Sequence, residues 1–204
     1  MKDLYKLVLI LGLIPAAGCK PEYTEPDQLN QAIMSYDAKS IQYILDRGAD
    51  PDKSGNEYSD TPVNTAVNMF TVSNTPEKKK KAEEILKLIL GYSGDINKRD
   101  SVSGGTMLHY AKDSETLRLL VESGADVNAS DIKYGNTPLH TWILTFRSDL
   151  EMYRYLLEHG ADVNKKNSSG KTVIDYANDK NMKYSKDGKV KELYDILHQY
   201  SLKK

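Results

Sequence analysis

Apolar residues recur at helical spacing along most of this chain. The segments 117–121 and 153–157 place Leu, Val and Tyr three and four residues apart, with Glu and Arg nearby. This spacing puts one apolar stripe on each helix, and a single short helix pair cannot bury such a stripe by itself. The pattern therefore predicts amphipathic helices that are stabilised by packing against neighbouring units, with Leu120 and Leu157 buried.

Two short phrases alternate along the chain and mark where these helices begin and end. One phrase is Gly-Ala-Asp or a close variant, found at residues 48–52, 93–97, 124–128 and 160–164. The other phrase is centred on a threonine, at Thr61, Thr106, Thr137 and Thr172. Threonine caps a helix N-terminus, proline is favoured directly after the cap, and glycine takes the left-handed conformation that stops a helix. Each threonine is therefore predicted to begin a helix pair, and each glycine phrase to close one.

The period of these phrases indicates a repeat protein. The four threonines lie 45, 31 and 35 residues apart, close to the ankyrin period of about 33 apart from one insertion. Over roughly residues 27 to 200 the chain resembles the ankyrin-repeat family. The resemblance implies an all-α solenoid of about five helix-turn-helix repeats with β-turn fingers, occupying residues 27–204.

Several units depart from the family pattern. The first unit, beginning at Asp27, is polar and suits an N-terminal cap, and the helix predicted over 189–200 suits a C-terminal cap. The second unit carries about eleven extra residues, 71–81, predicted to lie between its two helices. The run Lys78–Lys81 at their end is predicted to be a solvated loop that continues into the next helix, with a contact for lipid headgroups or an acidic partner as the alternative. Trp142 stands where the family has a small residue, and its burial cannot be deduced from sequence.

The first nineteen residues have the pattern of a bacterial lipoprotein signal. Lys2 and Lys6 precede the apolar run 7–14, which is shorter than the roughly 20 residues that span a bilayer. The segment Ala16-Ala17-Gly18-Cys19 resembles a lipobox, although a cleaved signal with a coincidental cysteine is the alternative.

These features predict a signal peptide over residues 1–18, a lipid on Cys19 and a tether over residues 19–26, in which Pro21 and Pro26 oppose regular structure. Two or more acyl chains anchor a protein stably. Because residue 20 is Lys rather than Asp, the resemblance implies sorting to the outer membrane, facing the periplasm.

Composition and motifs argue against catalysis and against nucleic acid. The 204-residue chain has a net charge of −1 and one cysteine, so it lacks a basic field, a disulfide framework and a cysteine-based zinc site. His109 and His140 fall in the threonine phrases, where the resemblance implies a structural hydrogen-bonding role. The periodic Asp50, Asp95, Asp126 and Asp162 suit turns. No catalytic or phosphate-binding motif is present, so no enzyme, metal or cofactor is predicted.

The candidate binding residues lie at loop tips and helix ends. Tyr58, Ile132 and Tyr134 are apolar or aromatic residues at loop positions that should be exposed, and Met34, Met69 and Leu144 fall near helix ends on the same side. Aromatic side chains often anchor interfaces. The alternative is that they are the isolated exposed apolar groups common on any protein surface.

The functional prediction is a protein-binding module that is a monomer when free. The resemblance extends to lipid-anchored ankyrin proteins that confer immunity by neutralising a toxic effector, such as a type VI secretion lipase. An envelope scaffold or stress-protection protein with no toxin partner is the first alternative. An enzyme subunit or small-ligand binder is the second, and it requires a cluster of titratable groups in a closed pocket.

Overall fold

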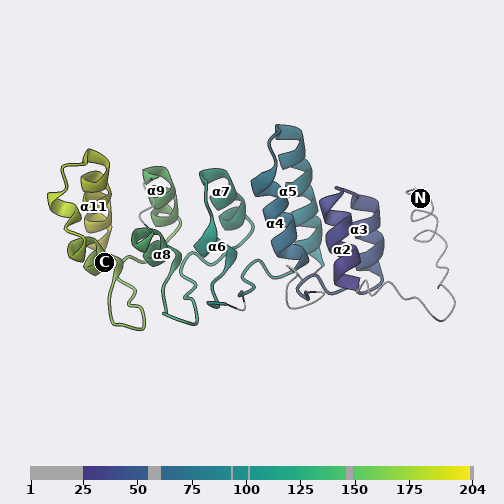
Figure 1. Cartoon of the computed structure of the whole chain (residues 1–204), viewed down its shortest axis with the longest axis horizontal. Helices are drawn as coiled ribbons and strands as arrows, with labels where there is room; N and C mark the ends of the chain where they lie inside the picture. Colours follow the sequence, from purple (N-terminus) through teal and green to yellow (C-terminus); the bar gives the residue numbers. More distant parts are fainter. Residues whose placement is uncertain (1–24, 55–60, 93, 101, 146–148, 203–204) are drawn as a thin grey trace.

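The computed structural model describes residues 25–54, 61–92, 94–100, 102–145 and 149–202. Within these ranges it contains ten α-helices, one short 3-10 helix and no strand (Figure 1). The helices form five consecutive pairs: α2 (Glu25–Met34) with α3 (Ala38–Asp46), α4 (Pro62–Val72) with α5 (Pro76–Gly91), α6 (Met107–Tyr110) with α7 (Ser114–Glu122), α8 (Pro138–Leu144) with α9 (Leu150–Glu158), and α10 (Val173–Asp179) with α11 (Gly188–Ser201). The 3-10 helix η1 (Met182–Tyr184) lies between the last two.

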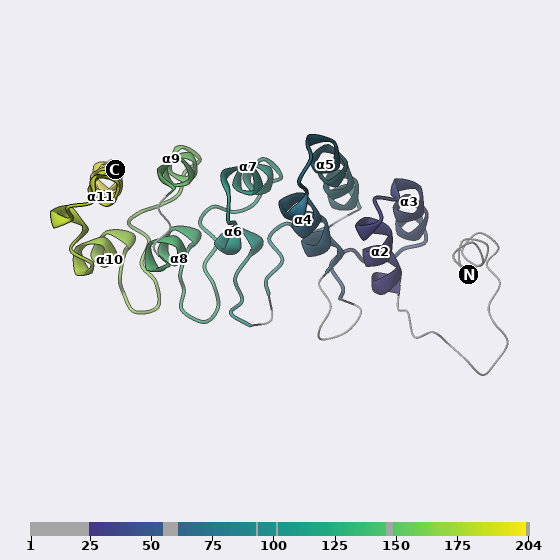
Figure 2. The same cartoon turned by 45° about the horizontal axis from the view of Figure 1, so that its top comes forward.

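The pairs stand side by side as a solenoid. Figure 2 shows the first helix of each pair in one row, the second helices in a parallel row, and the connecting loops projecting on the side of the first helices. Neighbouring pairs pack through both rows, for example α6 and α10 against α8, and α7 and α11 against α9. The predicted all-α stack of five helix-turn-helix units is confirmed.

The threonine phrases begin the first helices of four pairs, as predicted. Thr61, Thr106, Thr137 and Thr172 are the N-caps of α4, α6, α8 and α10. In α4 the Thr61 hydroxyl oxygen accepts a hydrogen bond of 3.3 Å from the Asn64 N–H, and Pro62 occupies the first helical position, where a missing N–H costs nothing.

The glycine phrases close the second helices of three pairs. Gly48, Gly124 and Gly160 follow α3, α7 and α9 with φ of +88°, +91° and +88°, the left-handed conformation that ends a helix. Gly94 has another role, because a Cβ there would come within 2.9 Å of the Val63 side chain. Glycine is therefore needed at position 94 because the backbone there packs closely against α4, the first helix of the same pair.

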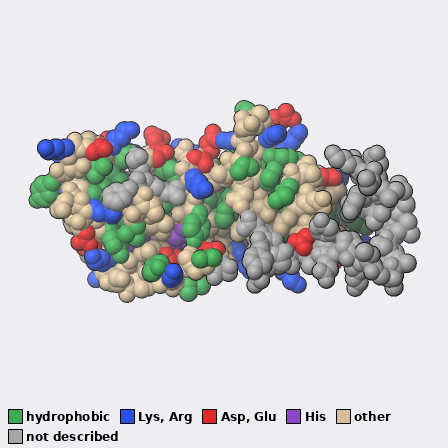
Figure 3. All heavy atoms as spheres, in the orientation of Figure 1, with side chains coloured by type: hydrophobic (Ala, Val, Ile, Leu, Met, Phe, Trp, Pro, Cys, Tyr) green, Lys and Arg blue, Asp and Glu red, His purple; other side chains and the backbone are tan. Residues whose placement is uncertain are grey.

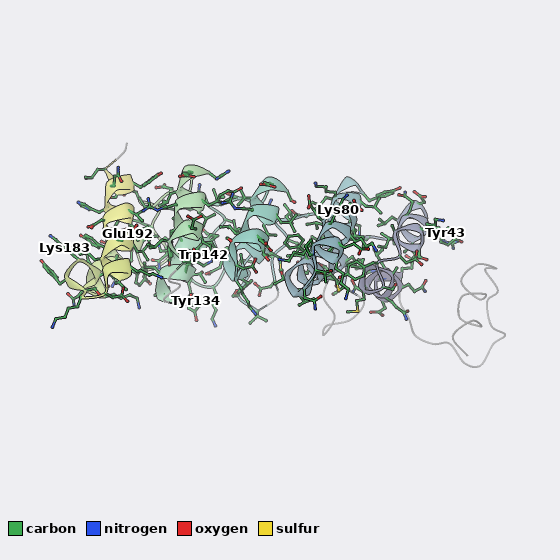
Figure 4. The ribbon with its side chains drawn as sticks, turned by 90° about the horizontal axis from the view of Figure 1, so that it is seen from above. Tyr43, Lys80, Tyr134, Trp142, Lys183 and Glu192 are labelled. Carbon is green, nitrogen blue, oxygen red and sulfur yellow. The ribbon has the colours of Figure 1, made fainter. Side chains whose placement is uncertain are left out.

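A continuous apolar core runs between the two rows of helices. Leu120 is fully buried and Leu157 is 4% exposed, as predicted for residues that stack neighbouring pairs. Trp142, whose burial the sequence left open, is fully buried in α8 and meets the Tyr153 ring of α9 edge-on at 5.7 Å between centroids (Figure 4). The indole therefore fills the space inside the fourth pair and is not part of the outer surface.

Two sequence predictions of boundaries are wrong. Residues 71–81 do not form a loop, because α4 continues to Val72 and α5 begins at Pro76. Thr75 caps α5 by accepting a hydrogen bond of 3.3 Å from the Lys78 N–H, so the lysine run lies in the first turns of a 16-residue helix that extends beyond its neighbours (Figure 1).

The predicted tether over residues 19–26 is also too long, because Glu25 and Pro26 are helical and Pro26 is buried. Proline is tolerated in the first turn of a helix, where no amide hydrogen bond is lost. Cys19 and the predicted signal peptide lie outside the described residues.

Candidate protein-binding face

The connecting loops stand next to one another on the side of the first helices. We call the surface formed by loops 97–106, 128–137 and 164–172 the loop face (Figure 2). Each loop is closed by a backbone hydrogen bond across its base: Asp100 N–H to Gly105 O and Asp131 N–H to Asn136 O, both 2.8 Å, and Asn167 N–H to Lys171 O, 3.0 Å. Each loop therefore has its own defined conformation.

Successive loops are also tied to each other. Ser103 O accepts hydrogen bonds of 3.1 and 3.0 Å from the N–H groups of Ile132 and Lys133, and Tyr134 O accepts one of 2.9 Å from the Ser168 N–H. A Cβ on Gly104 would lie 2.5 Å from Ile132, so glycine at this position lets the Ile132 side chain lie directly over the preceding loop. The three loops therefore form one connected surface.

The carboxylate of Asp100 organises the loop 97–106. It accepts hydrogen bonds from the N–H groups of Val102, Ser103 and Gly105, each 2.7 Å, and one of 2.8 Å from the Tyr110 hydroxyl. Partial burial by itself raises the pKa of Asp100, but these hydrogen bonds outweigh it and lower the pKa to about 2. The carboxylate is therefore charged at neutral pH and is engaged inside its own loop.

Three large apolar or aromatic side chains are exposed on the loop face. Ile132 is 74% exposed and Tyr134 is 51% exposed, in agreement with their predicted exposure (Figure 4). Val102, which the sequence reasoning did not single out, is the most exposed of the three at 86%. An aliphatic residue between two serines in a predicted loop tip was the available signal.

The other predicted binding residues differ in their exposure. Met34 and Leu144, at the ends of α2 and α8, are exposed, whereas Met69 in α4 is half-buried and packs against the core. Tyr58 lies outside the described residues. The role of all these residues in binding stays a prediction.

His109 and His140 make hydrogen bonds of the structural kind that the resemblance implied. His109 Nδ1 accepts from the Thr106 N–H at 3.0 Å, and its Nε2 lies 3.0 Å from Asn136 O of the next repeat. His140 repeats this geometry with Thr137 and Lys171. Burial is the main cause that lowers the pKa of both rings, which favours the neutral form that these contacts require.

The periodic aspartates also have a turn role. The Oδ1 atoms of Asp50, Asp95, Asp126 and Asp162 each accept a hydrogen bond from the backbone N–H two residues later. The side chain of the residue that carries this N–H then forms hydrogen bonds with the next repeat. After the third pair, for example, Asn128 accepts from the Asp162 N–H at 2.7 Å and donates to Gly160 O at 2.8 Å, both of which follow the fourth pair. This bridge recurs at Asn97, and the sequence reasoning did not predict it.

The described residues contain no group of three or more His, Cys, Asp or Glu side chains that could hold a metal ion. In the same part of the chain, no helix is long and apolar enough to cross a bilayer.

A hollow of about 230 Å³ between the start of α3 and α5 is lined by Tyr36, Ala38, Lys81, Glu84, Ile85 and Leu88. It is below the size range of about 300–1,000 Å³ that is usual for small-molecule sites.

Comparison with known proteins agrees with this architecture. No curated protein matches the sequence. A family model described as ankyrin repeats in three copies matches residues 69–167 and 112–184, which together cover more than half of the chain. The chain belongs to the ankyrin-repeat family.

Proposed function

We propose that this protein binds a protein partner through the loop face while a lipid on Cys19 anchors it to the bacterial cell envelope. Ankyrin repeats are protein-interaction modules, which supports the binding role in general. The observation that carries the specific proposal is the group of exposed apolar side chains, Val102, Ile132 and Tyr134, on loops that are hydrogen-bonded to one another.

Order in these loops favours binding for an energetic reason. Immobilising a flexible loop on association costs free energy, and a loop that is already held by hydrogen bonds avoids much of that cost. Apolar side chains that are exposed in the free protein gain free energy when a partner covers them. Val102, Ile132 and Tyr134 are not part of the apolar core, so the packing of the repeats does not explain why they are apolar.

The proposed membrane anchor rests on the first nineteen residues. An apolar run of eight residues followed by Ala16-Ala17-Gly18-Cys19 supports a lipoprotein signal. The Lys at position 20 supports an outer-membrane location facing the periplasm.

Within this proposal, the partner is a toxic effector such as a type VI secretion lipase, and the anchored protein acts as its immunity protein. The family resemblance and the envelope anchor support this role, because such toxins arrive in the periplasm. A strain that lacks the gene should then be killed by sister cells with an active secretion system. Survival of that strain, together with a partner that belongs to its own envelope, would favour the scaffold role instead.

Site-specific photo-crosslinking tests the binding face directly. A photoreactive phenylalanine analogue at position 134 is compared with the same analogue at position 43, because Tyr134 and Tyr43 are both 51% exposed. Tyr43 lies on α3 at the N-terminal end of the stack, away from the loop face (Figure 4). We expect a specific protein adduct from position 134 and none from position 43. Adducts of equal yield from both positions would refute the assignment.

A further inference from the structure

The loop face has a charge balance that differs from that of the whole chain. Loops 97–106, 128–137 and 164–172 contain six Lys or Arg residues and two Asp residues, although the net charge of the chain is −1. Figure 3 shows cationic and apolar side chains next to one another along the lower edge of the molecule, where the loops lie. The surface that projects furthest from the helices is therefore cationic.

The two carboxylates of these loops are turned toward the loop backbone. Asp100 accepts the hydrogen bonds described above, and Asp131 is 8% exposed and accepts one of 2.5 Å from the Tyr134 N–H. Neither side chain forms an ion pair with a loop lysine among the described residues. These two carboxylates therefore shape the loops and do not pair with the loop lysines.

The six cations fall into two groups of three. Arg99 donates to Gly104 O and Ser130 O, Lys165 donates to Asn128 O, and Lys171 pairs with Asp179. Lys98, Lys133 and Lys166 are exposed and form no ion pair among the described residues, although the Lys133 ammonium lies 5.0 Å from the Tyr134 ring centre. There is one such lysine on each successive loop. The pKa of Asp175 is lowered mainly by hydrogen bonds from Thr172 and to a smaller extent by the charges of Lys166 and Lys171.

We propose that the loop face recognises an acidic protein segment, in which Asp or Glu side chains pair with Lys98, Lys133 and Lys166 and an apolar side chain packs on Val102 and Ile132. This inference rests on the proposed function and specifies the chemistry of its partner. Charges at the edge of an apolar contact chiefly steer association and set its specificity. Lys98 shares a loop with Val102, Lys133 follows Ile132 directly, and Lys166 lies on the next loop, which is hydrogen-bonded to theirs, so one segment can satisfy both kinds of contact.

The same surface suits other polyanions less well. Single-stranded nucleic acid is bound by several stacked aromatic side chains in a continuous basic groove, whereas two of the three exposed apolar side chains named above, Val102 and Ile132, are aliphatic. A net charge of −1 also gives the whole molecule no long-range attraction to a phosphate polyanion or an anionic bilayer. An acidic protein segment fits the combination of few cations with exposed aliphatic groups.

The test is a peptide selection with matched variants. A phage-displayed library of random peptides is selected on the wild-type protein, and the affinity of enriched peptides is then measured by fluorescence anisotropy. The variant K98E/K133E/K166E reverses the three loop lysines. The control K39E/K189E/K191E makes the same change in charge at three exposed lysines of α3 and α11. A third variant, V102S/I132S, removes the apolar contact.

We expect peptides enriched in Asp and Glu with at least one apolar residue, and affinity that falls at least tenfold in K98E/K133E/K166E and less than twofold in the control. Peptides that require Val102 and Ile132 but show no acidic enrichment would overturn this inference and leave the proposed binding face intact. Selection that yields no peptide sensitive to V102S/I132S would overturn both. Binding to phosphatidylglycerol vesicles or to a single-stranded oligonucleotide, in place of acidic peptides, would overturn the inference as well.

Discussion

Replacing Asn128 with Ala tests whether side-chain bridges between repeats stabilise the stack. Asn128 accepts a hydrogen bond of 2.7 Å from the Asp162 N–H and donates one of 2.8 Å to Gly160 O. A hydrogen bond contributes about 0.5–1.5 kcal/mol net, so the loss of two costs about 1–3 kcal/mol. Since Asn128 is half-buried, water replaces part of the loss, and we expect a decrease of about 2 kcal/mol in the free energy of unfolding. For a protein of this size, Tm should then fall by about 4–8 °C.

Urea denaturation followed by circular dichroism measures this decrease. The matched control is N178A, because the Asn178 side chain is exposed on α10 and its backbone carbonyl, which accepts from the Asn181 N–H, is kept in the variant. We expect N178A to stay within about 0.5 kcal/mol of the wild type, as is usual for surface substitutions. If N128A is as stable as N178A, the bridge contributes nothing and the argument from hydrogen bonding between repeats is wrong.

Three further predictions follow from the fold and from the N-terminal sequence. L120A and L157A should each lower the free energy of unfolding by about 2–5 kcal/mol, because both leucines are buried between repeats, and an unchanged Tm in both would contradict the stacking. Burial lowers the pKa of His109 and His140 in the folded protein, whereas in the unfolded chain a histidine has its ordinary pKa of about 6.5. The folded state is therefore most favoured above a pH of about 6.5, and this contribution to stability is lost as the pH falls toward the lowered pKa values. Unfolding free energies at pH 7.5 and 5 should therefore differ less in H109Q than in the wild type, and equal differences would contradict this origin. C19S should move the protein from the membrane fraction to the soluble fraction with an unchanged circular dichroism spectrum, whereas retention in the membrane fraction would refute the lipid anchor.

The parts of the fold that sequence reasoning predicted are those set by local chemistry. A threonine N-cap and a left-handed glycine depend on a few neighbouring residues, so Thr61 and Gly124 mark helix boundaries without knowledge of the rest of the chain. Thr75-Pro76 begins α5 in the same manner, so the sequence also carries a local signal for this helix start. The predicted loop over the lysine run is therefore wrong at a place where local chemistry marks a helix.

The parts that sequence reasoning did not predict depend on contacts between units. Trp142 is buried because Tyr153 of α9 provides an aromatic edge, and nothing near position 142 in the sequence indicates that contact. The Asn128 bridge likewise needs the distance between two repeats, although Asn recurs in the sequence two residues after three of the four periodic aspartates, at positions 97, 128 and 164. Such features follow from how closely the repeats approach, which a periodic sequence pattern does not specify.

Under the proposed function, the division between repeated and unrepeated residues separates stability from recognition. The residues that hold the stack, such as Thr137, His140 and Asn128, recur in successive units because each interface between repeats needs the same hydrogen bonds. Val102 and Ile132 do not recur and lie on the outside of loops whose backbone is already hydrogen-bonded. A side chain that the stack does not require is free to be chosen for a partner, and the ordered backbone beneath it lowers the entropic cost of that contact. This is why the candidate site consists of the irregular positions of an otherwise regular protein.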